Sequence, residues 1–176
     1  TSVAAGSFHT VEYRFEGQDT QLFKKGTSNA YAMTVAFWIK STVTGTAVVE
    51  LADDDNTRHI CKTFTVDSAD TWEKKVLAFA GDTTGTLNND TGRSFRINIF
   101  LGAGSNLTSG TLATSWASRT TANIAAGQTI NAASSTDNNV FITGLQMELG
   151  EYTSTTIPEF QFEERGASLR RCSFFK

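Results

Sequence analysis

Four consecutive residues with oxygen-bearing side chains, Asp53, Asp54, Asp55 and Asn56, stand between two strand-like stretches and could bind a metal ion. Calcium takes about six to eight oxygen ligands, mainly carboxylates and carbonyls. However, consecutive Asp side chains cannot all point at one ion, and no EF-hand spacing follows. Asp and Asn are also favoured in hairpin turns, where they form local hydrogen bonds. The sequence therefore predicts a solvated turn, with Asp53 and Asp55 as candidate metal ligands, and we expect no metal and no other cofactor.

The residues that could act as nucleophile or base do not form a recognisable catalytic motif. His9 and His59 both fall on predicted strands, and the sequence has no G-x-S-x-G nucleophile elbow. Cys61 and His59 are two positions apart, so they share one face of a strand, which is an ordinary arrangement. A glycosidase needs two positioned carboxylates, and none of the 18 acidic residues stands in a distinctive motif. We expect no enzymatic activity and name no catalytic residue.

Exposed aromatic rings are the remaining candidates for ligand binding, because sandwich domains often stack sugars on Trp or Tyr. Trp116 lies in a polar region and Tyr152 in an acidic tail, so both are candidate ligand-binding residues. Asn88, Asn89 and Asp90 lie in a polar loop and could read sugar hydroxyl groups. The alternative for Trp116 is a packing role, which the sequence also allows.

Composition limits the classes of partner. The chain has 176 residues and a formal net charge of −3, and its few basic clusters lie at Arg165, Arg170 and Arg171. We therefore expect no nucleic-acid binding. No apolar run reaches 18 residues, so we expect no membrane span. Cys61 and Cys172 have apolar neighbours, which predicts buried or half-buried thiols in a reducing compartment.

The elements that would position these residues are strands. Phe (13 residues) and Thr are abundant and favour a pleated sheet. Period-two alternation of apolar and polar residues predicts strands in "FHTVEYRFEG", "YAMTVAFWIKS", a hairpin over 46–52 and 58–66, "VLAF", "SFRINIFLGAG" and "NVFITGLQMEL". The inward residues would be His9, Val11, Tyr13 and Phe15; Met33, Val35, Phe37 and Ile39; Leu77 and Phe79; Phe95, Ile97, Ile99 and Leu101; and Phe141, Leu145, Met147 and Leu149.

These strands predict an all-β fold, a jelly-roll-like antiparallel β-sandwich over residues 1–150. Residues 102–139 are too long for a hairpin loop, and weak alternation in "LATSWASRT" and "QTINAA" predicts edge strands there. Residues 151–176 would form an extended tail and a short terminal segment. In the terminal segment, Leu169, Cys172 and Phe175 have helical spacing.

Three segments together resemble a known family. They are "GTSNAYAMTVAFWIKSTVTGT", "TWEKKVLAFAGDTTGTLNNDTG" with "INIFLGAGSN", and the stretch from "NVFITGLQMELG" to "LRRCSFF". They look like the β-sandwich module of fibre and appendage proteins of tailed phages, including marine and cyanobacterial phages. The family's last segment reads like "FYITGVQLEVG…ATPFEHRPYGEELALCQRYY". The matching places are held by Phe141, Ile142, Thr143, Gly144, Gln146, Glu148, Gly150, Pro158, Phe160, Gly166, Leu169, Cys172, Phe174 and Phe175.

The resemblance covers nearly the whole chain in order and departs from the family in two places. "EFQFEERG" stands where "FEHRPYG" is usual, and "LRRCSFF" where "LALCQRYY" is usual. Family members also usually carry a portion ahead of "AGSFHTVEYRFEGQ". We therefore expect the sequence, which begins at Thr1, to belong to a longer chain whose N-terminal strands complete the sandwich.

The resemblance implies a non-enzymatic virion protein, assembled in the cytoplasm of a bacterial host. Its implied tasks are recognition of a host-surface glycan and assembly with other virion proteins and with copies of itself, a trimer by analogy with other fibres. Phe160, Phe162, Phe174 and Phe175 are candidate subunit contacts. The alternatives are a capsid decoration protein, a carbohydrate-binding module attached to an enzyme, and a depolymerase. The last would need a convergent carboxylate pair.

Overall fold

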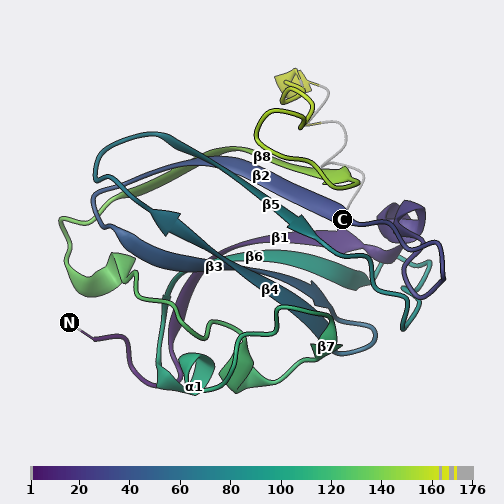
Figure 1. Cartoon of the computed structure of the whole chain (residues 1–176), viewed down its shortest axis with the longest axis horizontal. Helices are drawn as coiled ribbons and strands as arrows, with labels where there is room; N and C mark the ends of the chain where they lie inside the picture. The colour runs from purple at the N-terminus through teal and green to yellow at the C-terminus, as the bar shows by residue number, and fades with distance from the viewer. Residues whose placement is uncertain (1, 163, 167–168, 170–176) are drawn as a thin grey trace.

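The computed structural model of the protein describes residues 2–162, 164–166 and 169, and two antiparallel sheets form its body (Figure 1). The strands are β1 (Phe8–Glu16), β2 (Met33–Ser41), β3 (Gly45–Asp53), β4 (Arg58–Val66), β5 (Glu73–Phe79), β6 (Arg93–Ala103), β7 (Ala117–Ser118) and β8 (Val140–Leu149). The short helices are η1 (Gly17–Phe23), α1 (Ser105–Thr108), η2 (Thr121–Asn123) and η3 (Ala132–Ser134).

The larger sheet has the strand order β1-β6-β3-β4-β7, and the smaller has the order β5-β2-β8. All pairs are antiparallel, and β3 and β4 form the predicted hairpin, with Gly45 opposite Val66 and Asp53 opposite Arg58. The predicted all-β sandwich is therefore confirmed. The strand order does not single out a jelly roll, so that finer topology stays a prediction.

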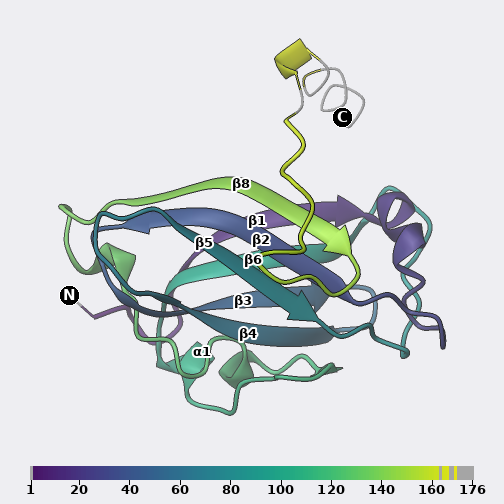
Figure 2. The ribbon, with the colours of Figure 1, turned by 45° about the horizontal axis from the view of Figure 1, so that its top comes forward.

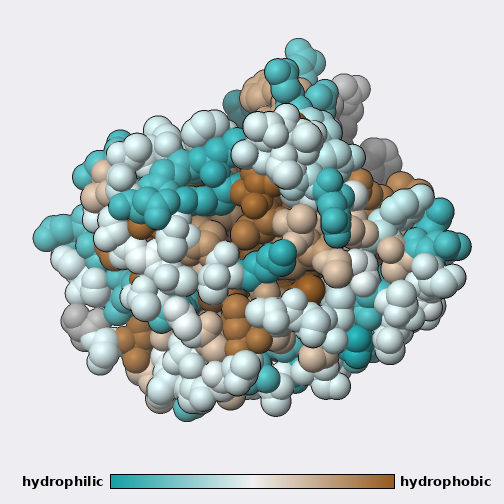
Figure 3. Space-filling view, in the orientation of Figure 1, coloured by the Kyte–Doolittle hydropathy of each residue, from teal (hydrophilic) through white to brown (hydrophobic). Residues whose placement is uncertain are grey.

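The main core lies between the two sheets and follows the alternation of the sequence. The inward residues predicted for β2 and β6 are all buried, and Phe79 of β5 is fully buried. Alternation places every second side chain on one face, so each strand delivers its apolar set to the same layer. Figure 3 views the molecule from the side of β4 and β5. Apolar side chains gather along the middle of this face, between the two sheets.

One of the inward residues predicted for β8 points outward in the structure. Ala36 pairs with Gln146, and Trp38 pairs with Thr143. The two β2 residues are two positions apart and their partners on β8 are three positions apart, so β8 contains a bulge. The extra residue reverses the alternation within the strand. Val140 and Ile142 precede the bulge and pack on the core, as Leu145, Met147 and Leu149 do after it. The prediction that Phe141 faces inward was wrong: its side chain is 52% exposed.

The edge strand β1 is only partly covered. Val11 and Tyr13 point to the same side as the core residues of β6 but are exposed, whereas Phe15 packs against the core. The smaller sheet has fewer strands than the larger one, so part of β1 has no strand of the other sheet opposite it. A cavity of about 630 Å³ lies between β1 and β8. We call it the open seam, and Tyr13, Phe15, Leu145, Met147, Phe160 and Phe162 are among its lining residues.

The long connection from β6 to β8 covers the outer face of the larger sheet. It contains α1, β7, η2 and η3, and a second small core forms beneath it. This core includes Val48, Cys61, Phe100, Leu107, Ala113, Ile124 and Ala125. The predicted edge strand in "LATSWASRT" is present only as β7, which pairs with Arg58 and His59. The "QTINAA" segment forms no strand: Thr129 and Ile130 instead donate backbone hydrogen bonds to the Thr46 carbonyl.

The tail after β8 first folds onto the smaller sheet and then projects from the body (Figure 2). The Thr34 hydroxyl donates to the Gly150 carbonyl at 2.8 Å and accepts from the Tyr152 backbone at 3.0 Å. Ile157 is buried, and Gln146 donates to the Pro158 carbonyl. Most of the predicted helical segment, including Cys172, Phe174 and Phe175, lies outside the described residues.

Candidate functional site

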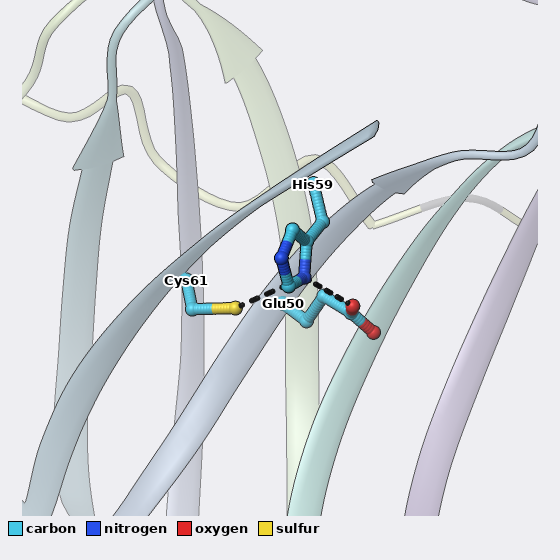
Figure 4. Close-up of side chains that lie close together, drawn as sticks. All are labelled: Glu50, His59 and Cys61. Carbon is cyan, nitrogen blue, oxygen red and sulfur yellow. Dashed lines mark hydrogen bonds and ion pairs between the residues drawn. The ribbon is translucent and has the colours of Figure 1, made fainter. Parts of the chain in front are cut away.

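A carboxylate, an imidazole and a thiol meet on the outer face of the larger sheet, beneath the long connection (Figure 4). Glu50 lies on β3, and His59 and Cys61 lie two positions apart on the neighbouring β4. His59 Nδ1 is 2.9 Å from Glu50 Oε1 and 3.7 Å from Cys61 Sγ. All three side chains are fully buried. The arrangement confirms that His59 and Cys61 share one face.

Two further residues complete this buried network. Arg119, which follows β7 in the long connection, donates from Nε to Glu50 Oε1 at 2.8 Å and from Nη2 to Oε2 at 3.2 Å. Asn98 of β6 donates from Nδ2 to Glu50 Oε2 at 2.9 Å. A buried carboxylate is stable only when it is paired and hydrogen-bonded, and Glu50 has both kinds of partner. The network therefore joins β3, β4, β6 and the long connection.

The pKa shifts in the network follow from burial and from these donors. Burial would raise the pKa of Glu50, but hydrogen bonds from His59, Arg119 and Asn98 outweigh it and hold the pKa below its ordinary value. Burial, reinforced by the Glu50 charge, raises the pKa of the Cys61 thiol far above its ordinary range. Because the thiolate is the reactive form, Cys61 is held in its unreactive state.

The same three side chains are a candidate metal cluster among the described residues. Their ligand atoms lie within 4.8 Å of one another, and carboxylate, imidazole and thiolate are ligands that zinc accepts. However, Glu50 is already paired with the Arg119 guanidinium. The positive charge of Arg119 would repel a metal dication bound at Glu50. The Cys61 thiol would also have to lose its proton to bind a metal, and burial opposes this because it raises the pKa of the thiol. The geometry therefore fits a structural ion pair better than a metal centre.

The turn at residues 53–56 was predicted to be solvated, but part of it is buried and its carboxylates are paired. Asp53 is fully buried and pairs with Lys25, Asp54 pairs with Arg96, and Asp55 accepts two hydrogen bonds from Asn88. The three carboxylates point to three different partners and do not converge on one point, which agrees with the expectation from the sequence. The metal-binding roles of Asp53 and Asp55 stay predictions.

At the same end of the sandwich, ion pairs and hydrogen bonds hold the loop between β5 and β6 against the body. Asp82 pairs with Lys25 at 3.0 Å and accepts from Arg58 at 2.7 and 3.0 Å. Burial would raise the pKa of Asp82, but the hydrogen bonds from Arg58 and Lys25 lower it. The backbone carbonyl of Asn88 accepts from Gln21, and that of Asp90 from the Gln18 amide. Asn89 is exposed in the same loop.

The predicted aromatic candidates do not lie together. Trp116 is partly buried and packs on the main core, and its Nε1 donates to the Ala80 carbonyl at 2.7 Å. Lys25 Nζ lies 5.3 Å from the Trp116 ring centroid. These contacts give Trp116 a packing role, the alternative that the sequence left open. Tyr152 lies at the start of the tail, where its backbone N–H donates to the Thr34 hydroxyl, and its ligand-binding role stays a prediction.

A groove of about 350 Å³ lies beside the buried network on the outer face of the larger sheet. We call it the outer groove. Its floor comes from β1 and β6, and its wall comes from α1 and the segment around η2. The residues that line it are Gly6, Phe8, Thr10, Glu12, Arg96, Asn98, Phe100, Asn106, Leu107, Arg119, Thr121 and Ile124.

Sequence reasoning missed both the network and the outer groove. Glu50 offered one signal, because it is a lone charge inside the apolar run "AVVELA". A charge in a buried strand requires a partner. Nothing in the sequence indicated that Arg119, which lies 69 positions away, supplies it.

Comparison of the chain with known protein families, curated proteins and solved structures found no match in any of the three. None of the helices in the described part of the chain is long and apolar enough to cross a membrane.

Proposed function

We propose that the chain is a non-enzymatic structural module of a phage virion, part of a fibre or appendage that serves host-surface recognition and subunit assembly. The resemblance in the sequence supports this proposal. Its segments fall on β2, β5, β6 and β8. β5, β2 and β8 together make up the whole smaller sheet. The segments that carry the resemblance therefore supply every strand of the smaller sheet and one strand, β6, of the larger sheet.

The observation that carries the assembly part of the proposal is the exposed aromatic tail beside the open seam. Phe160 and Phe162 are 48% and 86% exposed, and both line the open seam next to Tyr13. Apolar surface of this kind is costly in water and is common at protein interfaces. A second copy of the chain, or another virion protein, would cover it.

The observation that favours the recognition part is the outer groove. It combines polar groups on its floor with the exposed ring of Phe8 at its rim, a mixture common in small-ligand sites. The same observation supports the second candidate function, a carbohydrate-binding module of a larger enzyme. In a virion, many weakly binding copies would act together, because multivalency raises avidity without new contacts.

Electron microscopy of the intact particle tests this proposal. We expect the chain in several copies, in threes for a fibre, on a structure that projects from the virion. A position flat on the capsid lattice would contradict the fibre role and support capsid decoration. Absence of the chain from purified particles would overturn the virion proposal and leave the carbohydrate-binding module.

A further inference from the structure

The floor of the outer groove carries charged groups among apolar ones, but each charged group already has an opposite charge beside it. Arg96 donates to Glu12 at 2.9 Å and to Asp54 at 2.6 to 3.1 Å. Arg119 is paired with Glu50 in the same way. No unpaired charge therefore remains among these groups to attract an ionic ligand, whereas the paired groups can still accept from or donate to hydroxyl groups.

One polar atom of the floor has no partner among the described residues. Asn98 is 2% exposed and its Nδ2 is committed to Glu50 on β3, but its Oδ1 is a buried acceptor without a donor. The nitrogen and oxygen of an amide point in different directions. Oδ1 is therefore not the atom that contacts Glu50, and Asn98 lines the outer groove together with Glu12, its register partner on β1. A buried acceptor of this kind favours a ligand that brings a donor.

The rim and wall supply the rest of a binding surface. Phe8 is 52% exposed, and its ring is held in an edge-to-face contact with Phe100 at 6.0 Å between centroids. The face of an aromatic ring carries negative charge density and attracts the C–H groups of a sugar ring. Thr10, Thr121 and Asn106 add hydroxyl and amide groups around the same cavity.

We propose that the outer groove binds one neutral sugar residue of a glycan. The hydroxyl groups of the sugar would donate to Asn98 and Glu12 and accept from Arg96 or Arg119, while its apolar face lies on Phe8. The proposal deepens, and rests on, the host-surface role proposed above. It excludes anionic sugars as the preferred class, because Glu12 lines the groove and both guanidinium groups are already neutralised.

Titration of the isotope-labelled full chain with neutral disaccharides, followed by nuclear magnetic resonance, tests the proposal. Lactose, maltose and cellobiose are the probes, with sialyllactose as the charged comparison. We expect saturable shifts at groove residues such as Thr10 and Thr121 with at least one neutral disaccharide. Sialyllactose should bind no more tightly than lactose. No saturable shift with any neutral probe, or a clear preference for sialyllactose, would overturn the proposal.

Two matched variants locate the site. Phe8→Ala should weaken binding by about tenfold, because it removes the stacking ring. Phe141→Ala should leave binding unchanged, because Phe141 is equally exposed, at 52%, but lies on the other sheet. Thr121→Val, an exposed change in the groove wall, provides a second variant if Phe8→Ala is not folded. Equal affinity in wild type, Phe8→Ala and Thr121→Val would assign the binding elsewhere.

The disaccharide titration and the microscopy of the particle test the groove assignment and the virion role independently. A chain that projects from the virion but binds no neutral disaccharide would refute the groove assignment alone. Groove binding by a chain that is absent from the particle would refute the virion role alone.

Discussion

At the scale of single residues, Glu50 is the centre of the buried polar network of the larger sheet. Its carboxylate is fully buried and receives hydrogen bonds from Arg119, Asn98 and His59. A buried pair of this kind adds little relative to apolar residues, but the loss of one partner is costly because a charge stays behind unpaired. Removal of Arg119 should therefore destabilise the fold, because it leaves the Glu50 charge without its cation.

We expect Arg119→Met to lower the free energy of unfolding by about 2 to 4 kcal/mol. The Met side chain keeps much of the packing volume but leaves Glu50 without its cation. Denaturant unfolding measures the change. Arg14→Met is the matched control, because Arg14 forms an ion pair at the surface and its side chain is 64% exposed. The control should lose less than about 1 kcal/mol, and equal losses in both variants would contradict the role given to Arg119.

The pH dependence of stability follows from the same residue. The folded-state pKa of Glu50 is lower than its ordinary value of 4.5, so the unfolded chain binds the proton more readily. The carboxylate therefore stabilises the fold fully above pH 4.5, and this contribution is lost as the pH falls through the lowered folded-state pKa. The pKa of Asp82 is also lowered, so it acts in the same direction.

We expect the free energy of unfolding to fall as the pH is lowered from 7 to 3, with the loss concentrated below pH 4.5, the ordinary pKa of Glu50. Glu50→Gln should be less stable than wild type at pH 7, and the difference should shrink below pH 4.5. Denaturant unfolding at a series of pH values measures both. A difference that stays constant across this range would show that the Glu50 charge does not contribute.

At the scale of elements, the bulge in β8 decides which side chains reach the core. Gly144 lies within the bulge and has a φ of +60°, a conformation that costs residues with a Cβ about 1 to 2 kcal/mol. The space around it is not tight, because an added Cβ would lie 3.6 Å from Trp38 and 3.9 Å from Phe160. The requirement for glycine is therefore one of backbone conformation.

Substitution of Gly144 should follow the tolerance of each residue for positive φ. We expect Gly144→Val to destabilise by about 2 kcal/mol, and Gly144→Asn by less, because Asn adopts this conformation more readily. Thermal or denaturant unfolding of the two variants provides the comparison. If Asn were as costly as Val, crowding rather than backbone strain would explain the glycine.

The elements also show where prediction from the sequence succeeds and fails. Strands such as β2 and β6 were predicted with the correct inward residues, because alternation is a local property. Phe141 was misplaced because a single extra residue in β8 reverses the alternation, and the only local sign of it in the sequence is Gly144, since a lone glycine within a strand often marks a bulge. The network around Glu50 could not be predicted, because its members come from four separate segments that meet only in the folded sheet.

At the scale of the whole molecule, the two sheets are unequal and the tail is only partly attached. The open seam leaves Tyr13 exposed, and the tail leaves Phe160 and Phe162 exposed beside it. This aromatic surface would be covered if the chain associates with a copy of itself. The aromatic residues of the tail should then carry much of the association energy, as aromatic side chains often do at interfaces.

We expect the double variant Phe160→Ser, Phe162→Ser to shift the chain toward the monomer and raise the dissociation constant at least about tenfold. Light scattering coupled to size-exclusion chromatography, over a range of concentrations, measures the shift. Phe141→Ser is the control, because Phe141 is exposed but lies outside the open seam. A double variant that associates as wild type does would remove the tail from the subunit interface.

Some residues of the long connection line the outer groove without belonging to the small core that anchors the connection. Arg119 and the small core hold it on the sheet, whereas Thr121 and Asn106 face the outer groove without belonging to that core. Changes at the displayed positions can therefore accumulate while the scaffold is preserved. A lineage of such proteins could acquire new binding preferences quickly and keep one fold, and the same division makes these two positions a natural starting point for engineered libraries.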